Sequence, residues 1–206
     1  RPGPTLRKMP MILPIRIRDI AEQSHLLARD FGATLQGDCV ALSGERHVCP
    51  LPLGLVVHTL DARAEAGFET RAMRARGLIA HIVLEGPVQA WLDENPLLIG
   101  REGAEPVRLA ISAAREAVAF RRRAQRGDYL RKVNISASWD WLAAHGVSIE
   151  TVLGAGDLRQ ESWIAAPDEI AVTERLVALE SAEGAASGTP LEREALALAL
   201  ISRVLT

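Results

Sequence analysis

Cysteines and long apolar runs are scarce in this chain of 206 residues. Its two cysteines, Cys39 and Cys49, stand ten positions apart without a CxxC motif, which favours reduced thiols over a disulfide framework. No apolar run approaches the roughly 18 to 20 residues needed to cross a bilayer. The N-terminal region is interrupted by prolines and arginines and lacks the unbroken apolar core of a secretory signal. These absences predict a cytoplasmic protein without membrane contact.

Sequence motifs of catalysis and metal binding are also missing. There is no GxSxG nucleophile elbow. The five histidines never occur as HxH, and no carboxylate follows at the spacing of a facial metal triad. Gly154-Ala155-Gly156 begins like a dinucleotide fingerprint, but Arg159 occupies the position of its third glycine. The sequence therefore predicts no catalytic residue, no metal ligand and no cofactor.

The chain also lacks a strong charge of either sign, since its formal net charge is −2. The charges are unevenly distributed, because residues 140–206 hold 11 of the 26 acidic residues but only 4 of the 24 basic ones. Phosphate contacts dominate the binding of proteins to DNA. The acidic C-terminal third is therefore a poor candidate for a DNA-binding surface.

Apolar side chains are plentiful enough for a core, at 48% hydrophobic residues against 24% charged ones. Residues 19–30 follow a helical stripe. After Gly32, short apolar runs recur at spacings of about ten residues, which is typical of an antiparallel barrel or sandwich. The predicted strands are residues 39–42, 53–60, 77–84, 88–92, 97–99, 107–111, 117–120 and 130–135. The clearest predicted hairpin spans 77–100, with turns at 85–87 and 93–96.

The stretch YLRKVNISASWDWLAAHG, residues 129–146, changes from a strand period to a helical period. Ser138 is a natural N-cap and Gly146 a natural stop for a helix over 139–145. This helix is expected to bury its tryptophans against the outside of the β-portion. Further helices are predicted at 149–153, 167–183 and 191–205, with a break at 181–190. Strands first and helices second predict an α+β chain.

Two groups of polar residues remain open to more than one interpretation. His58 and His81 lie inside apolar strands, where each either points inward to a ligand or is a satisfied wall histidine. The run RRRAQRG, residues 121–127, is either a solvated hairpin tip, an anion-binding rim or a contact for an acidic partner surface.

Three segments carry a resemblance to a known family: LEGPVQAWLD at 84–93, GDYLRKVNIS at 127–136 and SWDWLAAHG at 138–146. Followed by an acidic helix and a Leu/Ala-rich terminal helix, they resemble the N-terminal regulatory half of AraC/XylS-type transcription regulators. Within that family they look most like the branch that includes siderophore-responsive activators. The resemblance covers residues 53–206, and its most specific part is 131–146.

The resemblance implies an antiparallel cupin-like β-barrel or jelly roll that binds a small effector, followed by a helical layer with a dimerisation helix. The corresponding segments are an N-terminal extension at 1–37, the effector-binding barrel at 38–136 and the helical dimerisation part at 137–206. The family's DNA-binding domain, with two helix-turn-helix motifs, is absent from this chain. DNA contact is therefore expected only through that further domain.

The leading hypothesis is a small-effector-sensing domain that forms a homodimer. The predicted ligand-binding residues are His58, His81, Val83, Trp91 and Phe120, and the predicted dimer contacts are Leu191, Leu198 and Leu205. The effector itself stays open between a siderophore, an aromatic acid, a sugar and a lipid-like metabolite. Two rival hypotheses are a cupin-fold metal-dependent enzyme acting on a small metabolite and a protein interaction module without a ligand.

Overall fold

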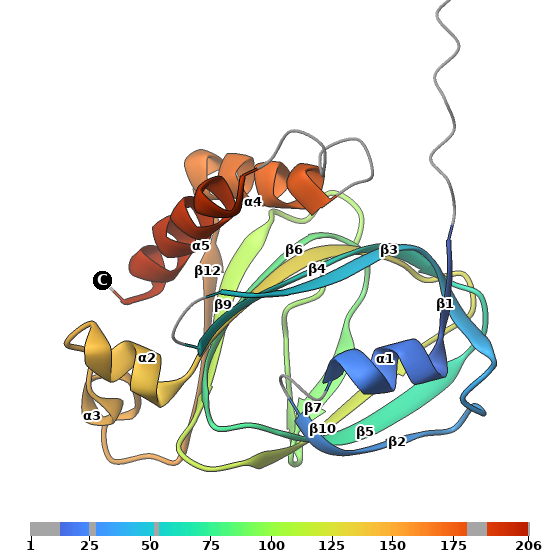
Figure 1. Ribbon diagram of the computed structural model, residues 1–206, viewed down its shortest axis with the longest axis horizontal. Helices are drawn as coiled ribbons and strands as arrows, with labels where there is room; N and C mark the ends of the chain where they lie inside the picture. The colour runs from blue at the N-terminus through green and yellow to red at the C-terminus, as the bar shows by residue number, and fades with distance from the viewer. Residues whose placement is uncertain (1–12, 25–27, 52–53, 181–188, 206) are drawn as a thin grey trace, which may run out of the picture.

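Two antiparallel β-sheets face one another, and helices cover the outer face of the larger sheet (Figure 1). The computed structural model describes residues 13–24, 28–51, 54–180 and 189–205. The architecture is α+β, as predicted. The strands form two separate sheets, and the described residues contain no closed barrel. The predicted cupin-like or jelly-roll fold is therefore not confirmed.

The large sheet has seven strands in the order β1-β3-β4-β11-β6-β9-β12. Their bounds are β1 Pro14–Arg16, β3 Val40–Pro50, β4 Leu55–Ala64, β11 Tyr129–Ala137, β6 Gly77–Glu85, β9 Arg108–Ala114 and β12 Leu158–Ile164. The small sheet has five strands in the order β2-β5-β10-β7-β8. Their bounds are β2 Ala28–Ala33, β5 Phe68–Arg74, β10 Val118–Ala124, β7 Gln89–Leu92 and β8 Asn95–Pro96. Strands from all three predicted segments contribute to the sheets, and the segment boundaries stay predictions.

The helices lie in two places. Helix α1 (Ile17–Ser24) packs beside β1, β2 and β3, whereas α2 (Trp139–Ala144), α3 (Ile149–Leu153), α4 (Pro167–Glu180) and α5 (Pro190–Leu205) lie on the side of the large sheet (Figure 1). Helices α4 and α5 contact each other, and both contact β6. Among the described residues, no helix combines the length and the apolar character needed to span a membrane.

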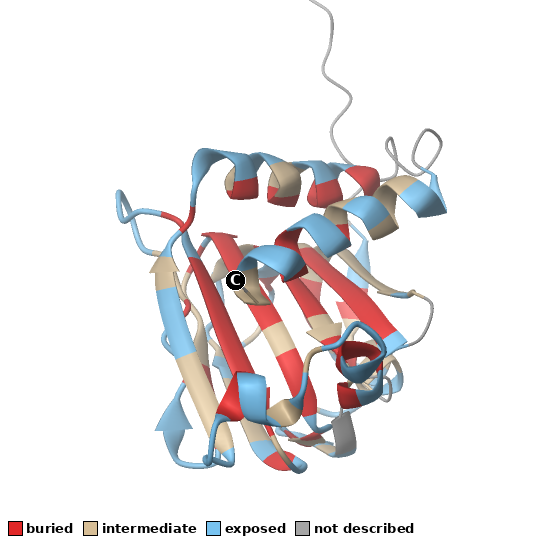
Figure 2. Ribbon diagram, turned by 90° about the vertical axis from the view of Figure 1, so that its left-hand side faces the viewer, coloured by how far each residue is buried: buried red, intermediate tan, exposed pale blue. Residues whose placement is uncertain are grey.

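The central strand β11 shows how side-chain alternation builds the layers. Val133, Ile135 and Ala137 belong to the core cluster that the large sheet shares with the helices. Figure 2 shows buried residues on the strands that lie beneath the helices. The alternate residues Lys132 and Asn134 face the space between the sheets. Successive strand residues point to opposite faces. The large sheet is therefore a wall with an apolar face toward the helices and a mixed face toward the small sheet.

The junction between β11 and α2 agrees with the sequence prediction. The Ser138 hydroxyl accepts a hydrogen bond from the Trp141 backbone N–H at 3.1 Å and caps α2. Trp139, Trp141 and Leu142 are buried. The Trp139 indole N–H donates to the Ala114 carbonyl of β9 at 3.1 Å. The two tryptophans thus fix α2 against the large sheet.

Several predicted elements differ from the structure. The predicted helix at 19–30 ends at Ser24, and residues 28–30 belong to β2 instead, with 25–27 outside the described residues. The predicted hairpin at 77–100 is wrong at its first turn, because β6 and β7 lie in different sheets, whereas β7 and β8 pair across its second turn. Gly86, with φ of 100°, forms the corner between them. The predicted strand at 97–99 is not formed, and β5 and β12 were not predicted.

Candidate functional site

A hollow of about 100 Å³ lies in the space between the two sheets. Four cationic side chains line it, together with six neutral polar and seven apolar ones. The cationic residues are Arg46, Arg74, Arg122 and Lys132; the neutral polar ones are Ser24, His58, Thr70, His81, Ser112 and Asn134; the apolar ones are Ile20, Phe31, Ala72, Ile79, Leu92, Leu97 and Phe120.

The hollow divides the interior between the sheets into two apolar clusters. One cluster includes Ile20 of α1 and is joined by Phe31 of β2. The other includes Leu92 and Leu97 and is joined by Phe120 of β10. A core that served stability alone would be filled by apolar side chains at close-packed density. Here polar side chains occupy the middle instead, which marks the hollow as the candidate site.

A chain of hydrogen bonds along one side of the hollow connects four strands, β5, β9, β6 and β11. The Arg74 Nη1 donates to Ser112 Oγ at 2.8 Å, and the Arg74 Nη2 donates to the Ser112 carbonyl, also at 2.8 Å. His81 lies between Ser112 Oγ, 2.7 Å from its Nε2, and Asn134 Oδ1, 3.1 Å from its Nδ1. Burial lowers the pKa of His81 to about 3, so its ring is neutral. Because Asn134 Oδ1 can only accept, Nδ1 carries the hydrogen and Nε2 accepts from Ser112.

Other polar atoms of the hollow have no such partners. Among the described residues, nothing forms a hydrogen bond with four of its buried nitrogens: Arg46 Nη1, His58 Nε2, Arg74 Nε and Arg122 Nε. Burial, together with the cationic neighbours Arg46, Lys132 and Arg122, lowers the pKa of His58 well below its usual value. Buried polar groups in proteins are normally satisfied. These atoms are therefore available to a bound molecule.

The cationic groups of the hollow act on one another. Burial lowers the pKa of Arg46 and of Arg122 to about 10, and the charge of Arg122 contributes to the shift of Arg46. Burial, then Arg122 and then Arg46 lower the pKa of Lys132 to about 7. At neutral pH the arginines are charged, and Lys132 is close to the midpoint of its titration.

Three of the five predicted ligand-binding residues, His58, His81 and Phe120, line the hollow. Val83 is buried in the interior apolar cluster but is not part of the lining. Trp91 lies on the outer face of the small sheet, where the Arg121 guanidinium stacks over its ring at 4.2 Å. Trp91 was expected to point into the β-portion, but the neighbouring residue Leu92 lines the hollow instead. Participation in ligand binding stays a prediction for all five.

None of the four cationic lining residues was among the predicted ligand-binding residues, although an anion-binding rim was one of three interpretations of the run at 121–127. Arg122 stands in the run RRRAQRG, which was expected at a hairpin tip, whereas residues 118–124 form strand β10 with Arg122 pointing inward and Arg121 outward. Arg74 lies on β5, whose inward residues Thr70, Ala72 and Arg74 give no apolar alternation. The sequence did contain one indication for Lys132. This residue alternates with Val133 on a strand whose other face is apolar, so it was expected on the opposite face.

The three predicted dimer residues stand on one stripe of α5. The exposed fractions of Leu191 and Leu198 are 74% and 37%. Leu205 is half-buried and packs against the core cluster beneath the helices. The adjoining side of α5 buries Ala197, Leu200 and Ile201. Leu191 and Leu198 are thus left outside the fold of the single chain, and a contact with a second chain stays a prediction.

Comparison with known proteins concerns most of the chain. The family described as Regulatory protein PchR N-terminal domain matches residues 43–206, a span that includes all four cationic residues of the hollow. Neither a curated protein nor a solved structure matches the chain. In the described residues, no three His, Cys, Asp or Glu side chains are grouped in a way that could hold a metal ion.

Proposed function

Because the chain belongs to the family of PchR regulatory N-terminal domains, which are parts of AraC-type transcription regulators, we propose that it senses a small effector and dimerises. The effector site is the hollow between the sheets. We assign DNA recognition to a further domain of the regulator. Because a regulator of this kind acts on DNA, we expect it to be cytoplasmic.

The observation that carries the proposal is the set of unpartnered buried nitrogens around the hollow. A buried donor or acceptor without a hydrogen bond costs about 1 to 3 kcal/mol. A molecule in the hollow would supply the missing partners and recover that cost. The apolar side chains of Phe31 and Phe120 would cover its remaining surface. An interaction module without a ligand would be expected to fill this space with large side chains.

The large sheet offers a direct connection from the hollow to the helices. Lys132 and Asn134 of β11 line the hollow, while Val133 and Ile135 of the same strand pack in the cluster that includes Leu176 of α4. A ligand that favours one position of β11 would therefore favour one arrangement of the helical layer. Helix α5 would carry this bias to the dimer contact through Leu191 and Leu198.

Native mass spectrometry of the purified chain tests both parts of the proposal. The expected result is a dimer that retains an additional organic mass. A monomer without any retained molecule would contradict the proposal, and a monomer that retains a metal ion would favour the metal-dependent enzyme.

A pair of variants connects the retained mass with the hollow. Ala72 is buried and lines the hollow, and its neighbour Met73 is half-buried and absent from the lining. Ala72→Phe should fill the hollow and abolish the retained mass, whereas Met73→Phe should keep it. Equal retention by both variants would place the bound molecule elsewhere.

A further inference from the structure

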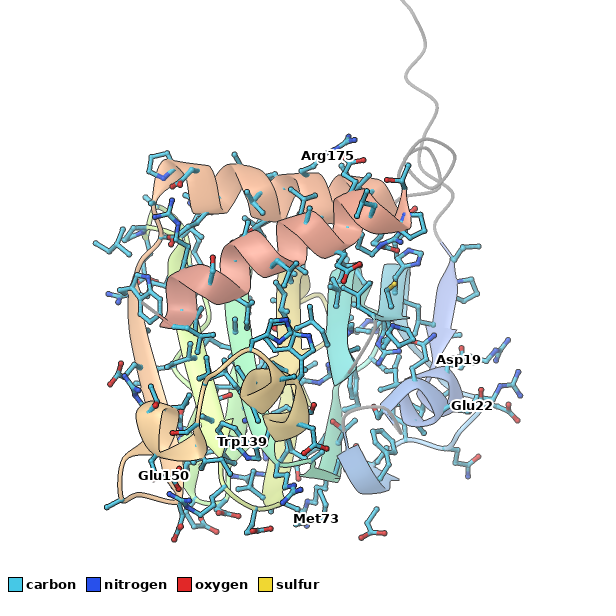
Figure 3. All side chains as sticks on the ribbon, turned by 60° about the vertical axis from the view of Figure 1, so that its left-hand side comes forward. Asp19, Glu22, Met73, Trp139, Glu150 and Arg175 are labelled. Carbon is cyan, nitrogen blue, oxygen red and sulfur yellow. The ribbon has the colours of Figure 1, made fainter. Side chains whose placement is uncertain are left out.

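The charges around the hollow are all of one sign. Its lining contains four basic side chains and, among the described residues, no carboxylate. Helix α1, which contributes Ile20 and Ser24 to the lining, carries Asp19 and Glu22 on its side turned away from the strands (Figure 3). Asp19 raises the pKa of Arg46, but this effect is smaller than the opposing effects of burial and Arg122.

Other arginines of the chain have acidic partners. Arg131 pairs with Asp61 and with Glu174, and Arg193 pairs with Glu180 between α5 and α4. In these places the fold pairs a partly buried arginine with a carboxylate. The two Nη atoms of Arg74 are held differently, by the hydroxyl and the carbonyl of Ser112, while its Nε has no partner among the described residues.

The other three cations of the hollow have neither a carboxylate partner nor a hydrogen bond to Ser112 among the described residues. Arg46 and Arg122 each leave a buried nitrogen without a partner, and Lys132 is only 6% exposed. Arg122 stands near both of the others, because its charge acts on each of them. Like charges in a desolvated space repel one another strongly. An empty hollow is therefore electrostatically unfavourable, and an anion would relieve the repulsion.

We propose that the effector is a small organic anion whose acidic oxygens bind between Arg46, Arg122 and Lys132. This inference rests on the proposed function and narrows its ligand class. Arginine and lysine form their strongest hydrogen bonds with carboxylate and phosphoryl oxygens. Phe31 and Phe120 lie in the same lining and receive the apolar part of the molecule. The sugar and other uncharged effectors are thereby disfavoured.

Thermal unfolding of the full chain with matched small probes tests the charge requirement. Butyrate and butyramide have nearly the same size and differ in charge, and inorganic phosphate supplies a second anion without an apolar part. At constant ionic strength, butyrate or phosphate should raise the melting temperature and butyramide should not, since only a ligand that binds the folded state stabilises it.

Arg122→Gln and Arg121→Gln form a matched pair for the position of the anion. Arg121 is the neighbouring residue of β10 and stacks on Trp91 outside the hollow. Arg122→Gln should weaken anion binding by roughly tenfold to hundredfold, the range of a lost charge-assisted hydrogen bond, and Arg121→Gln should leave it unchanged. Without an anion, Arg122→Gln should raise the melting temperature, because one of three repelling charges is removed.

The outcomes separate this inference from the proposed function. Equal stabilisation by butyrate and butyramide, or no stabilisation by butyrate and phosphate, would contradict the proposal that the effector is an anion. So would equal losses of binding in the two arginine variants. A neutral molecule retained in native mass spectrometry would also contradict the proposal of an anionic effector, but it would support the proposal that the hollow binds an effector.

Discussion

At the scale of single residues, Ser112 connects the two parts of the buried hydrogen-bond chain. Its hydroxyl accepts from Arg74 and donates to His81. Ser112→Ala would leave a buried guanidinium nitrogen and a buried imidazole nitrogen without partners. We expect the free energy of unfolding to fall by about 1 to 3 kcal/mol, the cost of an unsatisfied buried polar group. Urea denaturation measures the change.

Ser136→Ala is the matched control for this prediction. Ser136 lies on β11, and its buried hydroxyl has no hydrogen-bond partner among the described residues. Removal of that hydroxyl should leave the stability unchanged or raise it slightly. Similar losses in the two serine variants would show that the hydrogen-bond chain contributes nothing specific.

Lys132 gives the protein a pH dependence with a definite sign. Burial, Arg122 and Arg46 lower its pKa from an ordinary value of 10.5 to about 7 in the fold. Between these pH values the unfolded chain binds more protons than the folded one, so stability contributed by this residue rises with pH. Below about pH 7 both states are protonated, and the full destabilising effect of the buried charge is present.

Lys132→Met should therefore be more stable than the wild type at pH 6.5 to 7, by about 1 to 4 kcal/mol, the range for replacing buried charges by apolar side chains. The difference should shrink as the pH rises to about 9. Chemical denaturation across this range measures it. His58 and His81 titrate below the range, and Arg46 and Arg122 above it, so a constant difference would show that Lys132 keeps its normal pKa.

At the scale of elements, the chain passes from β6 of the large sheet to β7 of the small sheet through the corner at Gly86. Its φ is 100°, and a Cβ atom at this position would lie 1.8 Å from the Tyr129 carbonyl oxygen. Gly86→Ala should destabilise the fold by more than the about 1 to 3 kcal/mol of backbone strain alone. The control is Gly127→Ala, since Gly127 has a φ of 91° and open space around its Cβ position. Equal losses in urea denaturation would show that the contact with Tyr129 relaxes freely.

At the scale of the whole molecule, the proposed dimer depends on the exposed stripe of α5. Leu198→Glu should make the protein more monomeric, because a carboxylate would be buried without a partner in the contact. Ala199→Glu is the control, as residue 199 is exposed and turned by about 100° around the helix. Light scattering measures the mass of both variants. An unchanged dimer in Leu198→Glu would rule out this stripe.

The helical part was predictable from the sequence to a large extent, and the β-part to a smaller one. Caps and periodicity located α3 at 149–153, and the cap at Ser138 located the start of α2. Strand pairing was lost where consecutive strands change sheets, because a glycine corner and a hairpin turn have the same composition. The site was only partly predictable: inward-facing cations such as Arg122 violate the apolar pattern by which strand faces are recognised.

Strand β11 lines the hollow and packs against the helices with alternate residues of one nine-residue segment. If the hollow binds the proposed effector, substitutions at Lys132 or Asn134 should change ligand binding, and those at Val133 or Ile135 should change the packing of the helices. The lining of the hollow and the packing against the helices can therefore change independently among related proteins. A deletion of one residue within the segment would exchange both sets at once. Evolution of this domain is thus free to vary its side chains here, but not its length.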